Sequence, residues 1–247
     1  MKNSRPILAA LAAGLFLSTT GPVHAQGGPG GPNSGMNPAM LKIFGDVKGF
    51  SAIAEMRVLQ TGQKEMMSGT INFAMLDGKT RMEMDLTQMK SAQMPPEVTA
   101  QLKQMGIDIN IILNLPDKNV TRLIYPNLKA YLELPQPPVI EAKLKLEQKE
   151  LGKETIDGHT CVKNKITVTD DSGKKSEAVT WNATDLKGFP IQVELQEQQG
   201  TTFVMRYKDI KLSKPDAKLF EPPVGFKKYT SQQEMMQAEV LKRLGGK

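Results

Sequence analysis

The chain has 247 residues, a net charge of +6 at pH 7, a single cysteine and two histidines. Its positive charge is dispersed among acidic neighbours, as in the segment 141–150, and no basic block carries interleaved aromatic residues, which argues against nucleic-acid binding. One cysteine cannot form an intrachain disulfide, so the fold depends on its hydrophobic core.

The first 25 residues have the pattern of a secretory signal peptide. Lys2 and Arg5 form a basic start, the apolar run 7–17 follows, and Ala25 supplies the small residue of a cleavage site. The apolar run is shorter than the ~20 residues that span a bilayer. We therefore predict cleavage after Ala25, a periplasmic location and no membrane span.

Residues 26–38 are rich in glycine and proline and bury nothing, so we predict a flexible tether. The main domain is expected to cover residues 39–230. It begins with the apolar stretch Met40–Phe44, for which we expect one or two helical turns.

From Phe50 onward, apolar residues recur at every second position, which is the period of a strand buried on one face. The segment 50–58 shows this alternation, and so do 67–75 and 82–86. Asp77-Gly78 separates the last two segments and tolerates a positive φ, so these strands are predicted to form a hairpin.

The period changes over the segment 95–106, and Met94 just before it falls on one helical face with Val98, Leu102 and Met105. Gly106 suits the end of a helix. We predict one helix here, lying over the apolar face of the strands.

Alternating segments resume after this helix and continue to Tyr207, separated by turn residues such as Asp117, Asn127 and Gly200. We count about ten strands and few helices, without the strand–helix–strand rhythm of a parallel sheet. The prediction is a mainly β fold, a single antiparallel sheet that is strongly curved or closed.

The last segment, 231–247, predicts a C-terminal amphipathic helix. Ser231 and Glu234 form a capping-box pattern, and apolar residues follow at helical spacing from Met235 to Leu244. Such a helix packs on its own domain or, as the alternative, binds a partner.

His159 and Cys161 are two residues apart on a predicted strand, which makes them a candidate for a catalytic cysteine–histidine pair. Parallel side chains on one strand face rarely exchange a proton, so the structural interpretation is favoured. Because Cys161 shares its face with Lys163 and Lys165, we expect the thiol to be partly exposed. The sequence shows no metal-ligand set and no cofactor motif. Asp170–Gly173 is acidic, but it fits a hairpin turn better than a calcium loop. A non-enzymatic protein without a cofactor is expected.

The chain contains 15 methionines but only 8 Phe, 4 Tyr and 1 Trp. Flexible, polarizable thioethers suit a surface that repacks around apolar ligands, although they also fill ordinary cores. Both interpretations stay open at this point. The residues expected to line a ligand cavity are Met56, Val58, Met67, Ile71, Phe73, Met82, Met84, Met94, Val98, Leu102, Trp181 and Met205.

Three segments carry a resemblance to a known family: Gly152–Cys161 (GKETIDGHTC), Ala178–Pro190 (AVTWNATDLKGFP) and Leu219–Phe226 (LFEPPVGF). With the strand order and the covering helix, they resemble the LolA-like superfamily of periplasmic outer-membrane lipoprotein carriers, and within it an uncharacterised family of exported LolA-like domains. The resemblance implies a curved antiparallel half-barrel whose concave apolar side is closed by helices and holds acyl chains. Carriers of this kind use an arginine to hold the lid. Arg81 falls on the polar face by parity, so that role is not transferred to it.

Together these patterns favour an exported, non-enzymatic protein that binds a lipid or acyl-chain ligand in the half-barrel. The alternative is an envelope sensor or interaction module that uses the same fold to bind an envelope protein.

Overall fold

The computed structural model describes residues 42–61, 63–91, 94–136, 145–169, 173, 175–196 and 200–245. The predicted signal peptide and tether lie outside these residues. Within the described ranges, no helix combines the length and the apolar character needed to cross a membrane.

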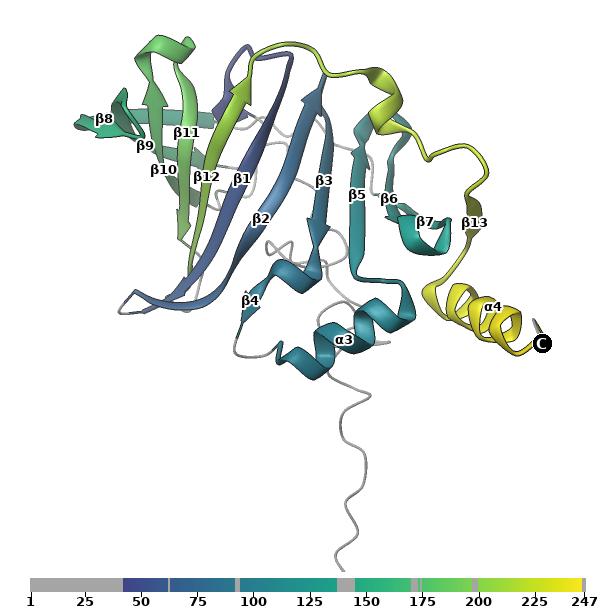
Figure 1. Ribbon diagram of the computed structural model, residues 1–247. Coiled ribbons are helices and arrows are strands. Elements are labelled where there is room, and N and C mark those ends of the chain that lie inside the picture. Colours follow the sequence, from purple (N-terminus) through teal and green to yellow (C-terminus); the bar gives the residue numbers. More distant parts are fainter. Residues whose placement is uncertain are drawn as a thin grey trace, which may run out of the picture.

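One open, curved sheet of 13 strands forms the body of the protein (Figure 1). The strands are β1 (Gly49–Gln60), β2 (Lys64–Leu76), β3 (Lys79–Asp85), β4 (Lys90–Ser91), β5 (Ile109–Leu115), β6 (Val120–Tyr125), β7 (Ala130–Pro135), β8 (Lys145–Ile156), β9 (His159–Thr169), β10 (Lys175–Ala183), β11 (Phe189–Gln196), β12 (Thr202–Lys211) and β13 (Lys227–Tyr229). The helical elements are η1 (Lys42–Phe44), η2 (Leu86–Gln88), α3 (Pro96–Met105), η3 (Pro116–Lys118), η4 (Pro126–Leu128), η5 (Thr184–Leu186), η6 (Ala217–Phe220) and α4 (Gln232–Gly245).

The strands follow the order β13-β7-β6-β5-β3-β2-β1-β12-β11-β10-β9-β8, with the short β4 paired to β2. Neighbours are antiparallel except β13 and β7, which are parallel. The predicted mainly β, half-barrel fold is confirmed, and the strand number exceeds the expected ten or so. Two of the extra strands are β4 and β13, which are too short to show a period in the sequence.

The turn at Asp77-Gly78 joins β2 to β3 as predicted. Both residues have positive φ, 48° and 84°, the backbone conformation that matches the twist of a two-residue hairpin. The register then places Met82 opposite Phe73 and Met84 opposite Ile71.

We call the face of the sheet that carries Phe50 and Phe73 the inner face, and the opposite one the outer face. On the inner face, five aromatic rings meet with centroids between 4.7 and 6.5 Å apart. They are Phe44 from η1, Phe50, Phe73, Phe189 and Tyr207. All five are buried, so this aromatic cluster seals the inner face near the start of β1.

The predicted helix exists as α3 and ends at Gly106 in the left-handed conformation, φ 76°. Pro96 occupies its first turn, where the missing N–H costs nothing. The helix lies below the lower ends of β3 and β5 in Figure 1 and packs against η2, with Leu102 as its buried residue.

The C-terminal helix, α4, is anchored by Met235, which is buried against Tyr229 and Leu132. Ser231 Oγ accepts from the Glu234 N–H at 3.1 Å, which is half of the predicted capping box. The Glu234 carboxylate accepts from Thr230 N–H at 2.9 Å instead of from Ser231. The cap therefore spans one residue more than the sequence pattern indicated.

Residues 212–230, which we call the strap, connect β12 to α4 (Figure 1). The strap carries η6, and Phe220 of η6 is buried with Ala74, Leu113 and Ile124 of the outer face. The strap thus covers apolar residues that the open sheet would leave in water.

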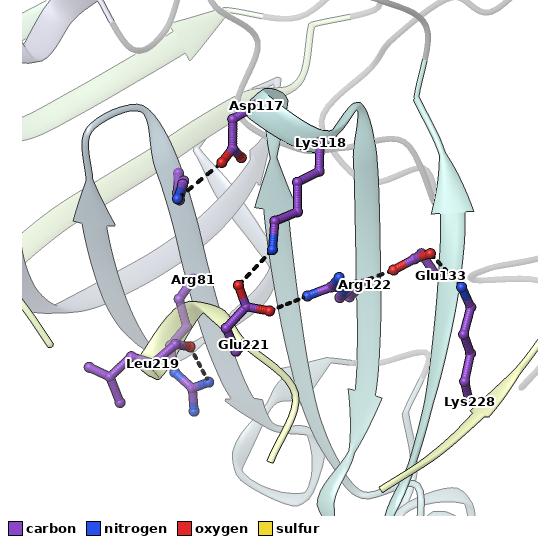
Figure 2. Close-up of polar contacts among 9 residues, drawn as sticks. Arg81, Asp117, Lys118, Arg122, Glu133, Leu219, Glu221 and Lys228 are labelled. Carbon is purple, nitrogen blue, oxygen red and sulfur yellow. Dashed lines mark hydrogen bonds and ion pairs between the residues drawn. The ribbon is translucent and has the colours of Figure 1, made fainter. Parts of the chain in front are cut away.

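Ion pairs fasten the strap to the outer face (Figure 2). Glu221 accepts from Lys118 Nζ at 2.6 Å and from Arg122 Nη1 at 2.7 Å. Arg122 Nε also donates to Glu133 at 2.8 Å, and Glu133 pairs with Lys228 at the far end of the strap. Beside this network, Arg81 Nη1 donates to the Leu219 carbonyl at 3.2 Å, so Arg81 lies on the outer face, as its parity predicted.

We expect Arg122→Gln to lower the free energy of unfolding by about 1–2 kcal/mol at pH 7. Most of this effect comes from the lost ion pair with Glu133, because Glu221 is half exposed and its ion pair contributes less. Hydrogen bonds from Lys228 and Arg122 lower the pKa of Glu133, and those from Lys118 and Arg122 lower the pKa of Glu221. This stabilisation is complete above the ordinary value of 4.5 and is lost as the pH falls through the lowered pKa values. Urea unfolding from pH 7 to pH 3 should therefore show the difference between the proteins shrinking at acid pH.

Lys145→Gln is the control, because Lys145 and Glu147 form a solvent-exposed pair on β8. No measurable change is expected for it. A constant difference between wild type and Arg122→Gln down to pH 3 would contradict the role of the two glutamates.

Candidate functional site

The inner face changes from sealed to accessible along its strands. On β1, Phe50 and Ala54 are 0% exposed, whereas Val58 at the other end is half-buried. Its partners across the ladder, Met67 on β2 and Phe203 on β12, are half-buried as well. The aromatic cluster therefore closes one end and leaves apolar side chains partly open to solvent at the other.

The residues predicted to line a cavity divide into two groups. The fully buried ones are Met56, Ile71, Phe73, Leu102, Trp181 and Met205. The half-buried ones are Val58, Met67, Met82, Met84, Met94 and Val98. Nine of the twelve belong to a single apolar cluster, and Val58, Val98 and Leu102 are the others.

The accessible region continues across β3, β5 and β6 through residues that the sequence did not single out. Met82 lies opposite Ile112, and Ile112 lies opposite Leu123. All three side chains are half-buried. We name the half-buried residues of the inner face, without Val98 of α3, the inner apolar surface, and its members are Val58, Met67, Met82, Met84, Met94, Ile112, Leu123 and Phe203. Only the register of β3, β5 and β6 shows that Ile112 and Leu123 join it, because both lie in runs that are apolar on both faces.

Along the central described stretches of β1, β2, β3, β5 and β6, the inner apolar surface has no charged neighbour on its own face. Strand alternation sends the charged side chains outward, as the outer-face ion pairs of Arg81, Arg122 and Glu133 show. An apolar ligand would therefore meet neither a charged group nor its bound water there. The described stretches to which this applies are 50–58, 67–75, 80–84, 110–114 and 121–125.

Two hollows lie elsewhere on the molecule. One, of about 740 Å³, is on the outer face beside the strap and shares only Phe73 with the predicted set; its lining includes Ile53, Arg81 and Leu219. The other, of about 500 Å³, follows the outer side of α4 along Met236, Val240 and Leu241.

Trp181 lies on β10, towards the β8 edge of the sheet. Its indole N–H donates to Glu154 Oε2 of β8 at 2.8 Å, and Lys163 Nζ is 4.8 Å from its ring centroid. Three strands, β11, β12 and β1, separate its strand β10 from β2. These contacts indicate a structural role in holding β8 and β9.

His159 and Cys161 do not form a catalytic pair. His159 Nδ1 is 2.7 Å from Asp185 Oδ2, while the Cys161 thiol donates to the His159 carbonyl at 3.5 Å. Cys161 is 0% exposed, and burial raises the pKa of its thiol. The expectation of a partly exposed thiol was wrong, because Cys161 pairs with Ala183, which pairs with Phe189, and all three are buried in the core. No group of His, Cys, Asp and Glu in the described residues is placed to hold a metal ion.

Comparisons with known proteins give structural likenesses only. No protein-family profile matches the sequence, and no curated protein matches it. Similar solved structures include an uncharacterized conserved protein from Thermus thermophilus, with 11% identity and a TM-score of 0.44 over 78% of this chain and 98% of that one. Lipoprotein LppX from Mycobacterium tuberculosis has 9% identity and a TM-score of 0.40, over 69% and 90% of the two chains.

A LolA superfamily protein from Nitrosomonas europaea is also similar, with 11% identity and a TM-score of 0.30 over 73% of this chain and 93% of that one. The superfamily that the sequence motifs resemble is thus represented among the similar structures. At such identities and TM-scores, the likeness says nothing about what this chain binds.

The burial of Cys161 has a direct chemical consequence. We expect the native protein to react with a disulfide reagent such as DTNB at least about a hundredfold more slowly than the same protein in guanidinium chloride, because the thiolate is both buried and disfavoured. Absorbance at a constant pH of 8 measures both rates. Equal rates would show that the thiol is accessible.

Proposed function

We propose that this chain is an exported, non-enzymatic protein that binds a lipid or other acyl-chain ligand on the inner apolar surface of its half-barrel. One observation carries the proposal: a continuous, uncharged set of half-buried apolar side chains, rich in methionine, extends from the sealed aromatic cluster. When a ligand removes the remaining surface of half-buried apolar side chains from water, the hydrophobic effect stabilises the complex.

The methionines support this use of the surface. Met67, Met82, Met84 and Met94 are the half-buried ones, and their unbranched side chains change rotamer at little cost. A surface of this kind suits acyl chains of varied length. Export after cleavage at Ala25 and a periplasmic location remain part of the proposal, on the pattern of residues 1–25.

A charge on the inner apolar surface is expected to weaken binding strongly. We expect wild type to enhance the fluorescence of a hydrophobic dye and of a fluorescent fatty acid, and Met84→Lys to weaken both by at least about tenfold, because the ligand would desolvate the new ammonium group. Met84 is half-buried, so the lysine reaches solvent in the free protein and folding is retained.

Ile53→Lys is the matched control, since Ile53 is similarly apolar but lies on the outer face. It should bind as wild type does. Native mass spectrometry of protein purified from its own host supplies the second measurement. Only unliganded protein there, together with no dye response, would contradict the proposal.

A second candidate function, an envelope interaction module, is favoured by α4. The helix is anchored through Met235, while Val240 and Leu241 on its outer side are 52% and 69% exposed. Exposed apolar residues next to a hollow of this kind are typical of a contact surface.

Val240→Ser with Leu241→Ser should remove a protein partner recovered from envelope extract without changing fatty-acid binding, because Met235 keeps the helix in place. Ile53→Ser is the control for the loss of an exposed apolar residue elsewhere. If wild type and the double variant recover the same proteins, this second function is wrong.

A further inference from the structure

Polar side chains interrupt the inner face next to the inner apolar surface. Thr80 on β3 lies opposite Asn114 on β5, and Asn114 lies opposite Thr121 on β6. Along β5, Asn110, Ile112 and Asn114 share the inner face at alternate positions. The two asparagines thus flank Ile112, a member of the inner apolar surface.

Three oxygens in this group are buried without a hydrogen-bond partner among the described residues: Thr80 Oγ1, Asn110 Oδ1 and Asn114 Oδ1. Thr80 is 0% exposed and Asn114 is 6% exposed. Thr121 differs, because Gln136 Nε2 donates to its hydroxyl. Unpaired buried oxygens destabilise a fold, so an apolar residue would serve stability better at these positions.

Asn164 shows how this fold treats a buried asparagine that is structural. Its Nδ2 donates to the Val162 carbonyl at 3.2 Å and to Asn182 Oδ1 at 3.1 Å. Asn110 and Asn114 differ from it in leaving their side-chain oxygens unpaired. In apolar binding sites, a few such polar groups fix the orientation and identity of the ligand.

We infer that Asn114 and Thr80, with Asn110 at the other side of Ile112, form a polar subsite for an uncharged hydrogen-bonding group, an alcohol or an amide, on the acyl-chain ligand. The inference rests on the proposed function and adds the class of ligand. A chain lying on Ile112 reaches Asn114 within two residues of β5, about 7 Å.

The electrostatics of this part of the inner face favour an uncharged ligand group over an anionic one. No side chain that is charged at neutral pH lies on the inner face of the described parts of β3, β5 and β6, so a carboxylate or phosphate would lose its hydration without gaining a counter-charge. Asp108, which precedes β5, would repel an anion, and its carboxylate already accepts from Asn127 at 2.8 Å. A hydroxyl or amide donates to the Asn114 and Thr80 oxygens at a far smaller loss of hydration.

Four probes with equal chain length, an alkane, a primary alcohol, a primary amide and a carboxylate, test the inference by displacing a bound hydrophobic dye from the full mature chain. We expect the alcohol and the amide to compete at least about tenfold better than the alkane, after correction for water solubility, and better than the carboxylate at pH 8. Equal competition by all four would overturn the subsite while leaving lipid binding intact. Absence of any dye binding would overturn the proposed function itself, and the subsite with it.

Asn114→Leu sharpens the test, because it should remove the preference for the alcohol and leave the thermal midpoint of the unliganded protein equal or higher. Asn164→Leu is the matched control: it should lower the midpoint, since it breaks two hydrogen bonds, and keep the preference. Thr80→Val, nearly isosteric, provides a second variant that folds. If both Asn114→Leu and Thr80→Val keep the wild-type preference for the alcohol, the inference is wrong.

Discussion

The aromatic cluster around Phe50 is the contact on which the rest of this structure depends. It joins rings from η1, β1, β2, β11 and β12, which are far apart in the sequence, and each ring pair adds about 0.5–1.5 kcal/mol beyond the burial of its area. Because the rings fill the inner face near the start of β1, the sheet is sealed there. Further along the same strands no rings remain to cover the face except Phe203, and the apolar side chains are left half-buried. The position of the inner apolar surface follows from where the rings stop.

The apolar side chains of the two faces of the sheet are shielded from water to different extents. The outer face is covered by the strap, with Phe220 in its apolar centre and the ion pairs of Arg122 around it. The charged side chains of β3 and β6 therefore form their ion pairs on the outer face. Over the described stretches 50–58, 67–75, 80–84, 110–114 and 121–125, the inner face keeps an uncharged surface that includes neutral polar groups such as Thr80 and Asn114. The strap also connects β12 to α4, so its contacts with the outer face influence where that helix begins.

The methionines of this chain serve two purposes that the sequence left undecided. Met56, Met75 and Met205 are buried core residues, which is the ordinary structural use. Met67 and Met82 are half-buried on the inner apolar surface, where flexible side chains are useful for a variable ligand. Each interpretation fits its own residues, and the difference is set by distance from the aromatic cluster. Leaving buried oxygens unpaired nearby is a cost that a purely structural core would avoid.

The sequence by itself determined most of the longer strands, the hairpin turn at Asp77-Gly78, the helix ending at Gly106 and the start of α4, because each depends on local period and backbone preference. Strand alternation, with the helical period for Met94, also found the nine of the twelve predicted cavity residues that share one apolar cluster. Only the tertiary structure decided that Cys161 is buried, that Ile112 and Leu123 join the inner apolar surface, and that Asn114 faces Thr80. Those facts depend on which strands become neighbours and in what register, and register between distant strands is not encoded in the alternation of any single one.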